Sequence, residues 1–375
     1  MTMDYLDALL EDLGEKERTA TPEELRRLLT LNDERDLHRL YQAAYRVKLR
    51  RIGRRVHLRG LIEVSNLCAK DCYYCGIRKS NHEVERFRID REDIIRMSKW
   101  AYDQHYGSVV LQSGEIASPE FIDYIDDLVR EIVALSDGRL SITLCLGEQS
   151  EDTYRRWRES GAQRYLLRIE TSNRELYGQL HPPDHDFNRR LACLKTLQQL
   201  DYQTGTGVMI GLPGQMADHL VDDLLFFRDH DFDMIGMGPY IPHHQTPLAD
   251  RVTNFDPVGQ FNLGLKMVAC ARLLLNDVNI VATTALQALD PLGRERGILA
   301  GANVLMPNIT DVRYRGNYQL YDRKPCLDEN SSQCRNCLER RVISTGETIA
   351  WDEPGDSPHY RFRHVNRNEV KRTGK

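Results

Sequence analysis

Short apolar runs rich in β-branched residues alternate with segments of helical length from His57 onward. This alternation predicts βα units, because strands that are separated by helices pair in parallel within one sheet. The predicted strands span residues 58–64, 108–112, 141–146, 165–170, 205–210, 234–237, 279–284 and 303–306. Eight parallel strands close into a (βα)8 barrel of the TIM type, an α/β fold whose reactive groups lie at the C-terminal ends of the strands.

The barrel prediction divides the 375-residue chain into four parts. Residues 1–55 form a helical extension of two amphipathic helices, the second beginning at Thr21 and Pro22, which have the pattern of a helix start. Residues 56–310 form the barrel, and residues 311–352 form a loop-rich segment with a second group of cysteines. Residues 353–375 are a polar tail that we expect to be loose.

Composition excludes several classes of protein. Hydrophobic residues make up 41% of the chain, yet no apolar run reaches the roughly 18 residues of a membrane helix. A net charge of −5 argues against nucleic-acid binding, and the acidic N-terminal sequence is unlike a signal peptide. We therefore expect a cytoplasmic monomer that binds neither membrane nor nucleic acid, with its nine cysteines free of disulfides.

Three cysteines follow the first predicted strand with the spacing C-x3-C-x2-C: Cys68, Cys72 and Cys75. A structural zinc site normally has four nitrogen or sulfur ligands, and the nearest histidine, His82, lies seven residues beyond Cys75. A 4Fe-4S cluster that is held by three thiolates keeps one iron open for a reactive ligand. The spacing favours such a cluster, with structural zinc and inert buried thiols as the alternatives.

Polar residues also lie at the ends of other predicted strands. Ser113, Gly114 and Glu115 follow the second strand, where the glycine lets a ligand approach the backbone and the glutamate can accept a hydrogen bond from an ammonium. Hydroxyl groups that could bind a carboxylate, or equally cap loops, belong to Thr143, Thr283 and Thr284.

The fourth predicted strand carries an unusual number of charges. With the two-residue period of a strand, Arg164, Arg168 and Glu170 share the face that points into the barrel, and Ile169 points outward. Unpaired charge inside a barrel costs several kcal/mol. We therefore expect these side chains to pair with one another in a self-satisfied network or to bind a polar ligand.

A second cysteine triplet, Cys326, Cys334 and Cys337, lies in a segment that we predict to be a polar loop, residues 327–339. Three soft ligands on a loop indicate a second metal centre. It would be a 2Fe-2S cluster with a non-cysteine fourth ligand, or zinc completed by another residue, with free thiols as the alternative.

The first triplet, its place after the first barrel strand and Tyr74 before the third cysteine resemble the radical SAM superfamily. Within it, long segments from residue 58 to residue 337 are similar to the HydE family of [FeFe]-hydrogenase maturases, among them IEVSNLCAKDCYYCGIRKSN, RYLLRIETSN and GVMIGLPGQ. The resemblance implies that the first triplet holds a 4Fe-4S cluster, at which S-adenosylmethionine (SAM) is cleaved to a 5′-deoxyadenosyl radical.

The resemblance also implies roles for single residues. Arg190 would pair with the SAM carboxylate and Glu170 with the ribose hydroxyls; Ser113 departs from the glycine that the family has at this position. The implied cofactor-binding residues are Tyr74, Ser113, Gly114, Glu115, Glu170, Arg190 and Met209. The implied substrate-binding residues are Thr143, Arg164, Arg168, Thr283, Thr284, Tyr318 and Tyr321. The second triplet would be an accessory cluster site.

The family further implies a substrate and partners. The radical would act on a cysteine-ligated Fe(CO)2(CN) synthon from HydG, in assembly of the diiron subcluster that passes to HydF, with an electron donor that the sequence does not identify. Methylornithine synthase and biotin synthase are the alternatives within the superfamily, and a non-catalytic iron-sulfur scaffold is the alternative outside it. We interpret four histidines in proline-bearing loops as ordinary loop residues: His181, His185, His243 and His244.

Overall fold

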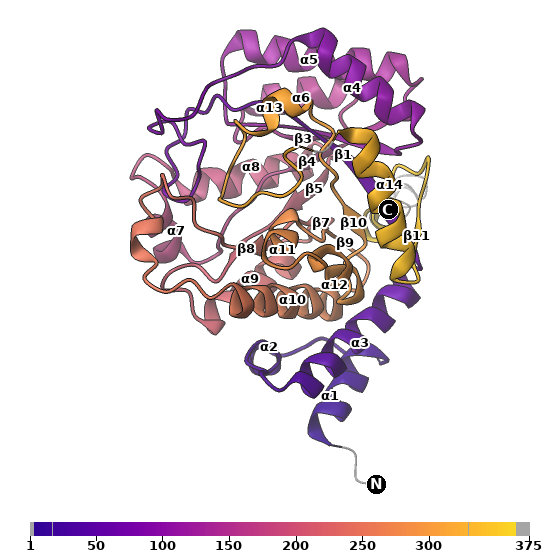
Figure 1. Ribbon diagram of the computed structural model, residues 1–375. Helices are drawn as coiled ribbons and strands as arrows, with labels where there is room; N and C mark the ends of the chain where they lie inside the picture. Colours follow the sequence, from indigo (N-terminus) through magenta and orange to yellow (C-terminus); the bar gives the residue numbers. More distant parts are fainter. Residues whose placement is uncertain (1–3, 17, 329, 365–375) are drawn as a thin grey trace, which may run out of the picture.

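The computed structural model describes residues 4–16, 18–328 and 330–364, and a parallel sheet lies at its centre (Figure 1). In spatial order the strands are β10 (Val304–Leu305), β1 (Arg55–Ser65), β2 (Ser108–Ser113), β3 (Ser141–Cys145), β4 (Arg164–Leu166), β5 (Gln203–Thr206), β7 (Met234–Ile235) and β9 (Asn279–Ile280). A parallel bridge between Val281 and Val304 joins the two ends of this order. The predicted (βα)8 architecture is confirmed.

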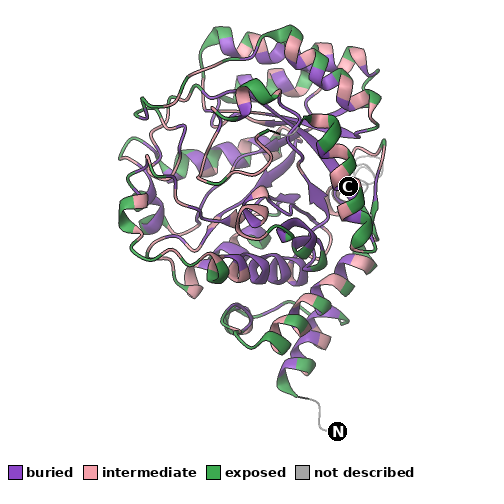
Figure 2. Cartoon of the chain, viewed as in Figure 1, coloured by how far each residue is buried: buried purple, intermediate pink, exposed green. Residues whose placement is uncertain are grey.

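Helices surround the sheet and leave its strands buried, as the purple centre of Figure 2 shows. They are α4 (Arg91–Asp103), α5 (Pro119–Leu135), α6 (Glu151–Ser160), α7 (Arg174–Leu180), α8 (Phe187–Gln199), α9 (Ala217–Asp229), α10 (Pro257–Leu274), α11 (Thr284–Leu289) and α12 (Gly293–Leu299). A second small sheet at the rim pairs β6 (Met209–Ile210) with β8 (Gly238–Pro239), and a short 3-10 helix covers Ala249–Arg251.

The N-terminal extension contains three helices instead of the two predicted: α1 (Tyr5–Gly14), α2 (Pro22–Leu29) and α3 (Glu34–Arg51). The second predicted helix divides after Leu29, because Asp33 starts a new helix by accepting hydrogen bonds from the backbone N–H groups of Arg35 and Asp36. Helices α2 and α3 pack on the outside of α10 and are drawn below it in Figure 1.

Six of the eight predicted strands are shorter than expected; β7, β9 and β10 have two residues each, and Thr284 of the predicted run 279–284 begins α11. β4 ends at Leu166, and Glu170 has the left-handed φ of 67°, so the extended backbone that the period-two pattern assumes does not continue to residue 170. The run 205–210 is divided between β5 and β6. Both breaks lie at the end of the barrel where the strands finish.

The chain after β10 runs through α13 (Val312–Arg315), α14 (Ser331–Ser344) and β11 (Thr348–Ile349), which pairs with β1. Cys334 and Cys337 therefore lie on a helix, so the prediction of a loop over 327–339 is wrong for most of that range. The sequence signal was present: Asn330 and Gln333 form a capping box at the start of α14.

Residues 353–357, which we call the C-terminal plug, enter the barrel at the end where the strands begin. The carbonyl oxygen of Gly355 accepts hydrogen bonds from Asn279 Nδ2 (2.8 Å) and Arg59 Nη2 (3.3 Å). Asp356 accepts from Gln203 Nε2 (3.0 Å) and pairs with Arg164. The expectation of a loose tail is wrong for residues 353–364, and residues 365–375 lie outside the described residues.

Candidate functional site

A cavity of about 280 Å3 opens at the C-terminal ends of the strands. All three thiols of the first triplet reach it, and so do residues from β2, β3 and the loops that follow β4, β5 and β9. The implied cofactor-binding residues that line it are Tyr74, Ser113, Gly114, Glu115, Glu170, Arg190 and Met209. The chain thus brings together residues that are more than 140 positions apart in the sequence.

The three thiols are placed where a negative charge is unfavourable without a cation. Burial raises the pKa of Cys72 to about 12, and it also raises the pKa of Cys68 and Cys75. The neighbouring thiols add to this effect at Cys72 and Cys75. The backbone N–H of Glu115 donates a hydrogen bond to Cys68 Sγ (3.3 Å). Thiolates at these positions need positive charge beside them, which the irons of a cluster would provide.

A group of three side chains that could bind a single metal ion lies outside the first triplet. Among the described residues it is His243, His244 and Asp322, whose possible ligand atoms all lie within 4.8 Å of one another.

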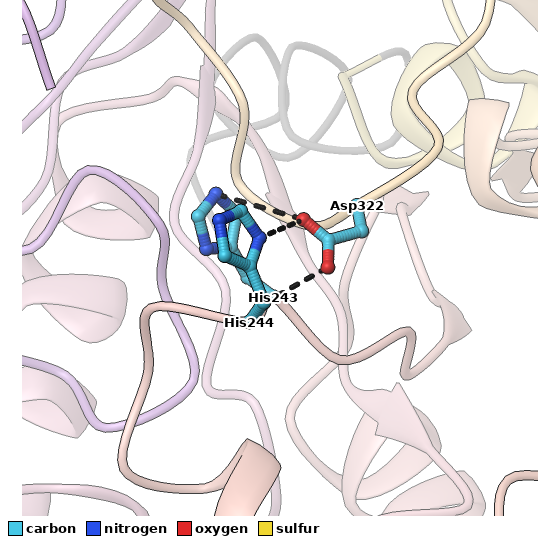
Figure 3. Close-up of side chains that lie close together, drawn as sticks. All are labelled: His243, His244 and Asp322. Atoms are coloured by element: carbon cyan, nitrogen blue, oxygen red, sulfur yellow. Dashed lines mark hydrogen bonds and ion pairs between the residues drawn. The ribbon is translucent and has the colours of Figure 1, made fainter. Parts of the chain in front are cut away.

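The group of His243, His244 and Asp322 is a hydrogen-bonded clasp, in which both rings lie beside the carboxylate (Figure 3). His244 Nδ1 lies 2.9 Å from Asp322 Oδ1. His243 Nδ1 accepts the backbone N–H of Gln245 (3.2 Å), so the proton of the neutral ring sits on Nε2, the nitrogen that faces Asp322. A metal-bound histidine instead donates from its second nitrogen. We therefore interpret these histidines, as in the sequence analysis, as loop residues.

Glu115 lies at the mouth of the cysteine loop and is almost fully enclosed. Its Oε2 accepts the backbone N–H of Glu148 (2.9 Å). Gly147 has a φ of 76°, and a Cβ there would lie 2.4 Å from Glu115 Cγ, so only glycine lets this carboxylate pack against the backbone. Burial raises the pKa of Glu115, and nearby Arg190 opposes that rise. A ligand ammonium at this carboxylate would add a further positive charge that favours its ionised form.

Arg190 projects from the first turn of α8, whose N-terminus Asp186 caps. Its Nη1 donates to the carbonyl oxygen of Arg168 (3.2 Å), and its Nε lies 3.0 Å from Glu148 Oε1. Burial alone would lower the pKa of Arg190, but Tyr177, Glu148 and Glu115 raise it overall. The guanidinium is therefore a fixed, permanent cation beside the cysteine loop.

Glu170 is the acid at the far side of the cofactor residues. Its backbone forms a parallel bridge with Val208, and its φ of 67° turns the side chain into the cavity. Its Oε2 has no hydrogen-bond partner in the part of the chain that the structure describes, and burial raises its pKa. An unpaired carboxylate oxygen in a cavity suits a ligand with hydroxyl donors.

The implied substrate residues divide into two groups. The residues that line the cavity are Arg168, Thr283, Thr284, Tyr318 and Tyr321. Thr143 and Arg164 do not line it. Arg164 is the first residue of β4, so it lies at the opposite end of the barrel, fully buried against Asp356 of the plug. The implied role of Arg164 in substrate binding is therefore wrong. A side chain that faces into a barrel reaches one end or the other according to its position along the strand.

Four charged residues of the site were not predicted: Glu63, Lys70, Glu148 and Lys324. Lys324 Nζ lies 2.5 Å from Glu63 Oε1, which ties the segment that carries Tyr318 and Tyr321 to the barrel. Cys145, at the end of β3, also lines the cavity, and burial raises its pKa to about 11. These residues are single charges or thiols that belong to no motif, so no sequence pattern identifies them as part of a site.

The second triplet lies away from this cavity. Cys334 is buried and Cys337 is half-buried on α14, and their three-residue spacing places them on one side of that helix. Cys326 has a left-handed φ of 61° and its backbone oxygen accepts from Arg315 Nη1 (2.9 Å). The arrangement differs from the predicted polar loop, because Cys334 and Cys337 lie on a helix that fixes their positions relative to each other.

Comparison with known proteins shows the family of this chain. Residues 62–227 match the family described as the radical SAM superfamily. The "[FeFe] hydrogenase maturase subunit HydE" of Thermotoga maritima is 45% identical over 348 residues, which are 92% of this chain and 96% of that protein. The chain belongs to the HydE family. Because this family lies within the radical SAM superfamily, the chain is an enzyme whose family implies a 4Fe-4S cluster and SAM.

Other relatives of this HydE-family chain lie further away. A 3-methylornithine synthase of Methanosarcina acetivorans is 27% identical, over 85% of this chain and 87% of its own. The crystal structure of a methylornithine synthase has a TM-score of 0.77 at 25% identity, covering 92% of this chain and 98% of its own. HydG from Carboxydothermus hydrogenoformans has a TM-score of 0.76 at 20% identity, covering 92% and 79%, and shows the shared fold. No helix in the described ranges is long and apolar enough to cross a membrane.

Proposed function

We propose that this chain acts in assembly of the diiron subcluster of [FeFe]-hydrogenase, as a radical SAM maturase. Its substrate would be a cysteine-ligated Fe(CO)2(CN) synthon made by HydG, and its product would pass toward HydF. The observation that carries the proposal is the 45% identity to a HydE over 92% of the chain. Identity to a methylornithine synthase over a similar length is 27%.

The chain's own residues would hold the cofactors as follows. Cys68, Cys72 and Cys75 would ligate three irons of the cluster, which with SAM supplies an organic radical. Glu115 would accept the ammonium of SAM, because its carboxylate lines the cavity together with the three cysteines. Arg190 would bind the carboxylate, and the unpaired Oε2 of Glu170 would accept from the ribose hydroxyls.

The second substrate would lie against the rest of the cavity wall. Arg168 supplies a cation that suits the carboxylate of a cysteine-derived ligand. Thr283 lines the cavity, and its Oγ1 has no partner among the described residues, so this hydroxyl would donate to the same ligand. Tyr318 and Tyr321 lie on the segment that covers the cavity, where they would exclude water from the radical.

The second triplet would hold an accessory cluster, 2Fe-2S or another centre, outside the cavity. Cysteines in two such groups keep their thiols only in a reducing compartment. The proposal therefore includes a cytoplasmic location. We also propose that the protein is a monomer. A redox-active cluster requires an electron donor, so the proposal includes one.

The test is anaerobic reconstitution of the protein with iron and sulfide, then reduction and addition of SAM. We expect the EPR signal of the reduced cluster to change with SAM, and 5′-deoxyadenosine to be released faster when the HydG product is present. The Cys72→Ser protein should lose both responses. The Arg168→Gln protein should keep the SAM-induced change in the EPR signal and lose the acceleration by the HydG product.

Three results would contradict the proposal in different ways. Release of 5′-deoxyadenosine that rises with L-lysine and ignores the HydG product would assign methylornithine synthase chemistry instead. Release that rises with dethiobiotin would point to biotin synthase chemistry. An EPR signal that SAM does not change would leave a non-catalytic scaffold.

A further inference from the structure

Two buried carboxylates and two cations alternate beside the cysteine loop. Lys70 Nζ lies 3.3 Å from Glu115 Oε1 and 3.3 Å from Glu148 Oε2. Arg190 lies between the same two acids, with its Nε 3.0 Å from Glu148 Oε1 and its Nη2 3.8 Å from Glu115 Oε2. The side chain of Glu148 is fully buried, and those of Lys70 and Arg190 are 14% and 10% exposed.

The elements that carry these groups are fixed. Lys70 lies between the first two cysteines of the cluster loop, so its backbone follows the position of the cluster ligands. Glu148 follows β3, in a loop where the hydroxyls of Tyr154 and Tyr165 donate to the carbonyl oxygen of Gly147. Gln149 Nε2 adds bonds to the carbonyl oxygens of Ile116 and Leu146. Glu148 is therefore placed by the barrel.

A third cation approaches the same carboxylate from outside. Arg189 Nε lies 3.3 Å from Glu148 Oε2, and 65% of the Arg189 side chain is exposed. Arg189 does not line the cavity, whereas Lys70 and Arg190 do, so these two are the cations of the group that a ligand in the cavity can meet.

Lys70 has one hydrogen-bond donor to spare. An ammonium carries three N–H donors; Lys70 donates one to Glu148 Oε2 (3.3 Å), and its contact with Glu115 Oε1 (3.3 Å) is an ion pair. Lys70 also lines the cavity. The third N–H can therefore reach a ligand, and a ligand ammonium at Glu115 would leave Lys70 held by Glu148.

We infer that Lys70 is a second recognition group for the carboxylate of SAM, beside Arg190, and that Glu148 is the positioning residue that holds both cations. The inference rests on the use of SAM by the family and not on the identity of the second substrate. If two cations bind the carboxylate of SAM, tight binding should require that carboxylate. Decarboxylated SAM keeps the ammonium, the sulfonium and the adenosine. A substitution that weakens binding of SAM but not of decarboxylated SAM therefore identifies a residue that recognises the carboxylate.

The experiment measures the dissociation constants of SAM and of decarboxylated SAM for the reconstituted, oxidised protein by equilibrium dialysis, without any second substrate. A charged hydrogen bond is worth about 10- to 100-fold in affinity. We expect Lys70→Met to raise the dissociation constant of SAM by about that factor. The dissociation constant of decarboxylated SAM should change by less than about threefold. Lys70→Arg, which keeps the charge, should restore most of the preference for SAM.

Arg189→Met is the matched control, because it removes a cation from the same carboxylate on the side away from the cavity; it should leave both constants unchanged. Equal weakening of both ligands by Lys70→Met, or no change in either, would overturn the inference. Iron content is measured in every variant. If Lys70→Met does not take up four irons, Lys70→Gln repeats the test with the hydrogen-bond donors retained, and failure of both to load iron would assign Lys70 to the cluster loop alone.

This test also separates the inference from the proposed function. The SAM preference can be lost in Lys70→Met whether or not the HydG product accelerates SAM cleavage. Conversely, a preference that does not depend on Lys70 would leave the maturase proposal untouched.

Discussion

The pair of Arg164 and Asp356 should hold the C-terminal plug in the barrel, and its removal should destabilise the whole protein. Arg164 is fully buried and Asp356 is 31% exposed. Breaking a buried pair by removing one partner costs about 3–5 kcal/mol. Because water reaches part of Asp356, we expect a cost below that range, about 2–3 kcal/mol, for Asp356→Asn. With a urea m value of about 3 kcal/mol/M, that loss moves the unfolding midpoint down by about 0.7–1 M.

The assay is urea unfolding of the reduced protein followed by circular dichroism, on a double-mutant cycle of Asp356→Asn and Arg164→Met. The coupling between the two changes should exceed about 1 kcal/mol, whereas changes at independent sites add within about 0.3–0.5 kcal/mol. Glu353→Gln is the control, because Glu353 and Arg55 form an exposed pair in the same segment (2.6 Å), worth about 0–1 kcal/mol. Additive effects in the cycle would refute the pairing.

The same pair should make stability depend on pH in the acid range. Burial raises the pKa of Asp356, but Arg164 and Gln203 lower it overall, below its ordinary value. A carboxyl with a lowered folded pKa stabilises above its unfolded pKa of about 3.9 and loses that contribution as the pH falls through the folded value. The difference between the natural protein and Asp356→Asn should therefore be constant from pH 5 to pH 7.

Three further predictions concern other contacts. Hydrogen bonds with Asp231 and Asp277 raise the pKa of His359 to about 10, so the stability lost in His359→Gln should be complete below pH 6.5 and shrink as the pH approaches 10, measured by urea midpoints. Gly147→Ala should weaken SAM binding by more than about tenfold, because its Cβ meets Glu115; Gly138→Ala, at a similar φ in open space, should not. Cys334→Ser should remove the irons of the second centre, by iron and sulfide analysis, and keep the SAM-induced change in the EPR signal.

Periodicity predicted the barrel because a buried parallel strand is a local pattern: each predicted strand contains or overlaps an observed one. It failed where tertiary contacts decide the backbone. Extended geometry through residue 170 was assumed from alternation, but Glu170 adopts a left-handed φ that few non-glycine residues take. Such a conformation depends on the bridge with Val208.

The cofactor residues could be located because they belong to motifs, and their supporting residues could not. Glu115 lies in a short pattern with Gly114, whereas Glu148 is one acid among many and acquires its importance only when β3 places it next to α8. The plug was missed for a related reason. Two of its contacts use the carbonyl oxygen of Gly355, and the sequence does not show which backbone groups accept such hydrogen bonds.

The C-terminal plug fills the end of the barrel where the strands begin, and the cavity opens at the end where they finish. At the plug end, burial lowers the pKa of Arg59 and of Arg164. These two cations face one carboxylate, that of Asp356, and the carbonyl oxygen of Gly355. Without the plug, both guanidiniums would face water along the barrel axis and attract anions into it. With it, the Asp356 carboxylate and the Gly355 carbonyl meet part of that charge inside the barrel. Lys70, Arg168 and Arg190 line the cavity at the other end, which no plug residue touches, so the plug and the cavity occupy opposite ends of one barrel.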